Sequence, residues 1–209
     1  MSIAAVHARI TELQRAFDPP APAAPPKAAT PASFAGRLQG AVTGAPTAAL
    51  GGLGGPAPVA GGTPAGQAML NLVRNEVGQA EQPPGSNDSP RIAQYRQATA
   101  GSGVGPWCAY FVSWAAREAG VPVGAQGEGH GSVDGLYAWA QQAGKAIPAG
   151  PGVTPQPGDL IVWDEHIGIV ESVGADGSVQ TIEGNSSDQV TRRDHGVGGD
   201  GAVGYVRLG

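Results

Sequence analysis

A single thiol is the first feature of this sequence that could do chemistry. The chain has 209 residues and one cysteine, Cys108. One cysteine excludes a disulfide scaffold and a cysteine-rich metal site. The thiol is therefore either a small buried apolar group or a nucleophile. It begins a predicted helix, residues 108–119, whose unpaired N–H groups and dipole would stabilise a thiolate and the oxyanion of an attacked carbonyl.

A nucleophilic thiol needs a base, and histidine is well suited to that role near neutral pH. The chain has four histidines. His7 lies outside the region with a globular pattern, and His130 and His195 lie in segments that we expect to be loops. His166 begins the strand-like run His-Ile-Gly-Ile-Val. A strand holds an imidazole in one orientation better than a loop does, which makes His166 the best candidate for the base. Taken alone, a histidine at such a position is more often structural than catalytic.

Two further polar side chains are candidates to orient the imidazole. Glu183 and Asn185 are two residues apart, so on a strand they lie on the same face. A turn at residues 174–177 would place this strand beside that of His166, which makes Glu183 a plausible cross-strand partner of the base. A carboxylate there fixes the tautomer and stabilises the imidazolium. For Asn185, a role in the site and a role as a turn residue at the strand end both remain open.

Three residues next to these candidates could contact a substrate. Trp107 precedes Cys108, and Trp163 lies three residues before His166. The two indoles either line a groove for the substrate or shield the site from water. Asp164 is expected to be a loop residue beside the base, where its carboxylate can contact the substrate.

The elements that position these residues are expected between residues 67 and 209, which we interpret as one globular domain. Helices are predicted first, at residues 67–78, 91–100, 108–119 and 132–144. Strand-like segments follow, at residues 157–165, 166–173, 178–184 and 201–208. Helices followed by a strand meander indicate an α+β domain rather than a series of βαβ units.

Residues 1–66 have a different composition. Apolar residues within positions 1–17 are spaced as one stripe of a short amphipathic helix. This helix is either a docking segment for a protein partner or export machinery, or a frayed helix without a partner. Residues 18–66 are mostly Ala, Gly and Pro, which predicts a disordered linker.

Charge and hydropathy exclude several classes of function. The net charge is −5, so no basic patch is large enough to indicate a nucleic-acid partner. No run of 18 apolar residues is present, so we expect no membrane span. The first residues lack the basic start and apolar run of a secretory signal, which predicts release by another route or a cytoplasmic location.

Residues from about 75 to 208 resemble the CHAP domain, the cysteine- and histidine-dependent amidohydrolase/peptidase module with a papain-like fold. The matching segments are GPWCAYFVSWAAREAG, QPGDLIVWDEHIGIVESV and SVQTIEGNSS. Their order is similar to that of the family, as are the spacings of 58 residues from Cys108 to His166 and 17 from His166 to Glu183. The resemblance implies helices packed on an antiparallel β-meander or half-barrel.

The resemblance also implies roles for these residues. Cys108 would be the nucleophile, His166 the base and then the acid, Glu183 the orienting carboxylate and Asn185 a supporting polar group. The family cleaves bacterial peptidoglycan, either as an N-acetylmuramoyl-L-alanine amidase or as a peptide endopeptidase. Some relatives bind calcium through an Asp-rich loop before the nucleophile, but this loop offers only Asp88 here. No metal or other cofactor is therefore expected.

Two other functions remain open at this point. The chain could be a thiol acyltransferase or an amidase that acts on another amide. It could also be a non-catalytic module that keeps the fold and binds a partner through its N-terminal helix. As a wall hydrolase, the protein would reach its substrate by phage-lysin release through a holin or by flagellar-type export.

Overall fold

The computed structural model describes residues 61–209. The predicted helix at residues 1–17 and most of the predicted linker lie outside the described residues. The described part has α+β architecture, with helices first and strands after them. Its helical elements are α3 (Pro64–Val73), the 3-10 helix η1 (Arg74–Glu76), α4 (Pro90–Arg96), α5 (Cys108–Glu118) and α6 (Val133–Gln142). Its strands are β1 (Ala146–Pro148), β2 (Leu160–Val162), β3 (Ile167–Val173), β4 (Ser178–Ser186), β5 (Gln189–Val197) and β6 (Gly204–Val206).

The strands form one antiparallel sheet with the order β1-β6-β2-β3-β4-β5. Strands β2 to β5 follow one another as a meander, and β6 and β1 extend the sheet on the other side of β2. The meander runs one strand further than we expected, because β5 covers a segment that we interpreted as a loop. His195 therefore lies on an edge strand, and the loop assignment was wrong.

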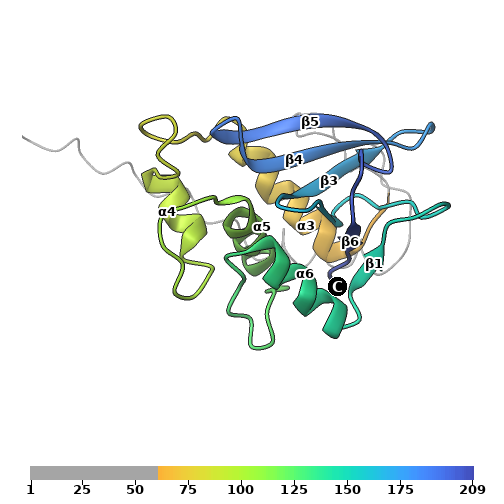
Figure 1. Ribbon diagram of the computed structural model, residues 1–209, viewed down its shortest axis with the longest axis horizontal. Helices are drawn as coiled ribbons and strands as arrows, with labels where there is room; N and C mark the ends of the chain where they lie inside the picture. The colour runs from red at the N-terminus through yellow and green to blue at the C-terminus, as the bar shows by residue number, and fades with distance from the viewer. Residues whose placement is uncertain (1–60) are drawn as a thin grey trace, which may run out of the picture. The chain divides into compact units, whose positions relative to one another are not determined.

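The helices lie on one side of strands β3 to β5, with α5 closest to the sheet (Figure 1). Every residue of α5 from Cys108 to Ala116 is buried, because this helix packs against β3, β4, α3 and α4. Its side chains meet the ring of Tyr95 from α4. Phe111 lies edge-on to this ring at 5.3 Å between centroids, and Trp114 lies at 5.0 Å. This aromatic packing fixes the position of α5, which carries the thiol.

Gly184 brings α5 and β4 into close contact. A Cβ atom at this position would lie 2.7 Å from Cβ of Phe111 and 2.8 Å from the indole of Trp107. Any larger residue would therefore push the helix away from the strand. The glycine next to Glu183 thus determines how near the start of α5 comes to the carboxylate.

The first described helix begins slightly before the predicted domain boundary. The Thr63 hydroxyl accepts a hydrogen bond from Gly66 N–H at 3.0 Å, and Pro64 occupies the first helical turn. Both are standard signals for a helix start, so α3 begins three residues before position 67. The same Thr63 hydroxyl donates to the carbonyl of Leu208 at 2.6 Å. The two ends of the described part are therefore joined. Across residues 61–209, no helix has both the length and the apolar character needed to cross a bilayer.

Candidate active site

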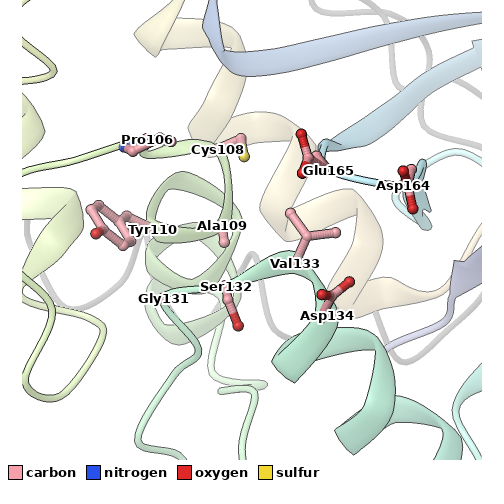
Figure 2. A pocket seen from close by; sticks show the side chains of 10 residues that line it. All are labelled: Pro106, Cys108, Ala109, Tyr110, Gly131, Ser132, Val133, Asp134, Asp164 and Glu165. Carbon is pink, nitrogen blue, oxygen red and sulfur yellow. The ribbon is translucent and has the colours of Figure 1, made fainter.

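The thiol of Cys108 opens onto a cleft of about 390 Å³. Cys108 is the first residue of α5 and is 4% exposed. The cleft lies between the start of α5, the segment that leads into α6, and the turn that joins β2 to β3. Figure 2 shows the sulfur beside Glu165, with Ser132 and Asp134 below it in the view. Cys108 is thus largely buried, yet it remains part of an accessible cavity.

His166 is placed by the tight turn between β2 and β3. Its carbonyl accepts the backbone N–H of Trp163 at 2.9 Å, and β3 begins at the next residue. The Cys108 side chain lies near enough to the imidazole to raise its pKa. Its Nε2 lies 2.8 Å from Oε2 of Glu183. Since Nε2 is engaged by the carboxylate, Nδ1 is the ring nitrogen left for the thiol.

Two neighbouring side chains, Cys108 and Glu183, change the protonation of His166. Burial lowers the pKa of His166, but the hydrogen bonds and negative charges of Cys108 and Glu183 outweigh this effect and raise the pKa to about 9. Burial raises the pKa of Glu183, while hydrogen bonds from His166, Thr181 and His195 oppose it and bring the pKa to about 2. At neutral pH, His166 is therefore an imidazolium that is paired with the carboxylate of Glu183 and lies beside the side chain of Cys108.

Gly168 makes room for the contact between Glu183 and His166. Glu183 lies on β4 with its side chain 2% exposed, and Gly168 lies on the neighbouring β3. A Cβ atom on Gly168 would lie only 2.7 Å from Cγ of Glu183. The missing side chain therefore leaves the space in which Glu183 reaches His166.

Replacing Gly168 by alanine should disturb the site more than the fold. The added methyl group would displace Glu183 from His166, so we expect the rate of Cys108 alkylation by iodoacetamide at pH 7 to change by roughly tenfold. The matched control is Gly150→Ala, because a Cβ atom at Gly150 meets no atom within 4 Å. Mass spectrometry measures the rate, and thermal unfolding measures stability. Equal alkylation rates in the two variants would contradict this role of Gly168.

Asn185 lies beside the site in a different way from the one expected. Its φ of 58° is in the left-handed region, and the pairing of β4 with β5 is irregular between Glu183 and Ser186. The backbone therefore departs from regular alternation at Asn185. Asn185 lines a second pocket of about 440 Å³, together with His166 and Glu183.

The three residues expected to contact the substrate lie in three different environments in the structure. Trp107 has no exposed surface, and its Nε1 donates to Glu81 at 2.9 Å. It supports the start of α5 from inside the core, so the expectation of a groove residue must be corrected. Trp163 packs against the imidazole of His166, with 5.7 Å between ring centroids, and lines the second pocket. Asp164 is exposed and lines the cleft that contains Cys108.

Two residues that contact Glu183 were missed by the sequence interpretation. Thr181 donates its hydroxyl hydrogen to Oε1 of Glu183 at 2.6 Å. Nε2 of His195 lies 2.7 Å from the same oxygen. The spacing of Thr181 and Glu183 on one strand was a usable signal, since residues two apart share a face. The pairing of β5 with β4 was the missing information for His195.

Within residues 61–209, no group of three or more His, Cys, Asp and Glu side chains has an arrangement that could hold a metal ion. The polar groups around His166 are instead engaged with one another through hydrogen bonds.

Comparison with known protein families identifies the domain. The family model of the CHAP domain matches residues 99–185. This range includes the start of α5, the turn before β3 and strand β4 as far as Asn185. The chain contains a CHAP domain. No curated protein and no solved structure matches it significantly. The CHAP domain indicates the cysteine- and histidine-dependent amidohydrolase class, with peptidoglycan as the general substrate. His195 lies beyond the residues that the CHAP model matches.

Proposed function

We propose that the protein hydrolyses an amide bond of bacterial peptidoglycan by cysteine nucleophilic catalysis. The bond is either the N-acetylmuramoyl-L-alanine amide or a peptide bond of the stem. The observation that carries the proposal is the hydrogen bond between His166 and Glu183 beside the Cys108 side chain, which lines a cleft at the start of α5. The helices packed against an antiparallel meander agree with a papain-like fold.

In this mechanism the thiolate of Cys108 attacks the carbonyl carbon of the amide. Backbone N–H groups of the first turn of α5 bind the oxyanion, since N–H groups at a helix start have no partner within the helix. The imidazolium of His166 gives its proton to the nitrogen as the C–N bond breaks, which leaves a thioester and a free amine. The neutral His166 then removes a proton from water, the hydroxide attacks the thioester, and the carboxylic product leaves.

Glu183 supports both steps without contacting the substrate. Its carboxylate accepts the Nε2–H of His166 and so keeps Nδ1 directed at the thiol. The low pKa of Glu183, about 2, means that the carboxylate stays charged across the pH range in which the reaction runs. A fixed negative charge at this position stabilises the imidazolium that must donate a proton to the amine.

Hydrolysis should decline in alkaline solution as His166 loses its proton. The proton donor is the imidazolium, and the pKa of His166 is raised to about 9. Nearly all His166 is therefore protonated at neutral pH, and the protonated fraction falls as the pH rises through about 9. Initial rates of wall hydrolysis between pH 6 and pH 11 measure the decline. A midpoint near the ordinary histidine value of 6.5 would contradict the proposed ion pair.

The charge of the cleft favours substrates that carry an amino group. Asp134, Asp164 and Glu165 line the cleft, and among the lining residues in the described part none is basic. Exposed carboxylates attract a cation over short distances and are screened by salt. Free amino groups of the diamino acids in peptidoglycan stems match this chemistry.

Removing two of these charges should weaken substrate binding. For the double variant Asp134→Asn, Asp164→Asn, we expect KM for a soluble muropeptide to rise roughly three- to tenfold at low salt, with kcat unchanged. The double variant Glu118→Gln, Asp176→Asn is the charge-matched control, because Glu118 lies at the other end of α5 and Asp176 lies in the turn between β3 and β4. The difference should shrink as sodium chloride is added. A lower kcat at unchanged KM would argue against a binding role.

The test of the proposed function is the identification of the products. Purified peptidoglycan is incubated with the protein, and the released fragments are separated and weighed by mass spectrometry. New N-acetylmuramic acid termini indicate the amidase, and new peptide termini indicate the endopeptidase. The control is the same protein alkylated with iodoacetamide, which modifies only Cys108 because the chain has one cysteine. Walls that stay intact in both samples would overturn the proposal.

The proposed function also requires a location for the protein. A wall hydrolase must meet peptidoglycan outside the cytoplasm, and we propose release through a phage holin or a flagellar-type exporter. Detection of the protein in the medium of cells with and without the exporter tests the second route.

A further inference from the structure

Glu183 binds two imidazoles, and the second belongs to a residue without a role in the proposed reaction. Oε2 of Glu183 lies 2.8 Å from Nε2 of His166, and Oε1 lies 2.7 Å from Nε2 of His195. The side chain of His195 is 12% exposed, and that of Glu183 is 2% exposed. A histidine therefore holds each oxygen of the carboxylate in a nearly closed environment.

The direction of the hydrogen bonds can be assigned from their shared acceptor. The Thr181 hydroxyl donates to Oε1, so its hydrogen is engaged. Nε2 of His195 lies 2.7 Å from Oε1 and 3.2 Å from the Thr181 oxygen. A charged carboxylate only accepts hydrogen bonds, so Nε2 of His195 carries the hydrogen and donates it. Oε1 thus has two donors, and rotation of the carboxylate would break both.

His195 is itself held from several elements. From the turn before β3, the indole of Trp163 packs against its ring at 4.8 Å between centroids. Trp163 donates its Nε1–H to the carbonyl of Gly199 at 2.7 Å, which ties the indole to the turn after β5. Asp200 in the same turn lies 4.0 Å from Nδ1 of His195. These contacts give the imidazole one orientation, which a group that positions another side chain requires.

The nearby arginine is a weaker restraint on the carboxylate. Nε of Arg193 lies 3.9 Å from Oε2 of Glu183, beyond hydrogen-bond distance, and its side chain is 51% exposed. Its charge is therefore screened by solvent. His195 and Thr181 are therefore the groups that hold Oε1 of Glu183, the oxygen that His166 does not contact.

We propose that His195 is a positioning residue, which acts through Glu183 to keep the imidazole of His166 directed at the Cys108 thiol. The inference rests on the proposed function, because it assigns Cys108 and His166 their roles in catalysis. The second imidazole adds a donor that the carboxylate would otherwise lack. The rotation of Glu183, and with it the orientation of His166, is then restricted from both sides.

Two substitutions distinguish the contribution of the N–H donor of His195 from that of its ring. His195→Gln keeps an N–H donor near the position of Nε2, and His195→Phe keeps a ring against Trp163 but has no donor. We expect the Phe variant to lose roughly tenfold in kcat for wall hydrolysis with KM unchanged, and the Gln variant to recover most of this loss. Asp194→Asn is the matched control on β5, because Asp194 accepts a hydrogen bond from Gln180 at 3.0 Å away from the site.

A double-variant cycle tests whether the effect passes through Glu183. On the Glu183→Gln background, His195→Phe should change the rate less than twofold, since the carboxylate that it positions is absent. The pH 7 alkylation rate of Cys108 by iodoacetamide is the second readout and needs no wall substrate. It should respond to His195→Phe and much less to Asp194→Asn.

The outcomes distinguish this inference from the proposed function. A tenfold loss on both backgrounds, or an equal loss for the Gln and Phe variants, would show that His195 serves the fold and would overturn its positioning role. If His195→Phe leaves the alkylation rate of Cys108 unchanged, the positioning role of His195 is also overturned. If the alkylation pattern appears as expected while no variant releases wall fragments, the positioning role stands and the hydrolase function fails.

Discussion

Replacing Cys108 by serine should lower the rate of peptidoglycan hydrolysis by a factor on the order of 10⁴ or more. Serine fits the same space, but His166 does not hold its hydroxyl as an anion, so the nucleophile is lost. The residue is 4% exposed, and its neighbours on α5 are buried, so a small isosteric change should leave the packing intact.

The measurement for this variant is the initial rate of fragment release, with thermal unfolding as the control for folding. The Tm should match that of the unmodified protein within a few degrees. A Ser variant that still releases fragments at a rate within tenfold of the original would exclude the cysteine mechanism. A variant that unfolds early would call for Cys108→Ala, which removes the thiol without adding a polar group.

Replacing His166 by alanine should have the second largest effect, a loss on the order of 10³ in kcat. Two functions of the imidazole disappear together. The thiol loses the partner that holds its proton, and the leaving amine loses its proton donor. Because both residues act in one step, the double variant Cys108→Ala, His166→Ala should be no slower than Cys108→Ala alone.

The pH dependence gives this prediction a second readout. Without His166, the alkaline decline near pH 9 should vanish from the residual activity, since the group responsible for it is absent. Asp176→Asn is a suitable control, because Asp176 lies in the exposed turn between β3 and β4. A decline that persists unchanged in the His166→Ala variant would assign the titration to another group.

The site could be predicted in part because its strongest signals are local. A helix start, a histidine before an apolar strand and a carboxylate on the next strand are all visible within short segments of sequence. The antiparallel meander follows from the turn between β3 and β4, which brings Glu183 close to His166. These features depend on neighbouring residues and on one short-range pairing, so the pattern of residue types contains them.

The features that were missed depend on packing between distant segments. Strand β5 is polar along its middle, at Arg192, Arg193 and Asp194, because an edge strand has few buried positions. It therefore lacks the apolar alternation by which a strand is predicted. Trp107 was misinterpreted for a related reason. Its partner Glu81 lies 26 residues earlier, and nothing near Trp107 in the sequence shows that its indole points inward.

The hydrogen bond between Thr63 and the carbonyl of Leu208 has a consequence for the order of the candidate residues along the chain. Since the ends of residues 61–209 meet, a short linker could join them, and new termini could be opened in the exposed segment before β2. In such a circular permutant, His166 and Glu183 would precede Cys108, yet the thiol, imidazole and carboxylate would keep their geometry. The order Cys, His, Glu along the chain would then be an inherited feature that the reaction does not need. The chemistry would depend only on where the fold holds the three groups.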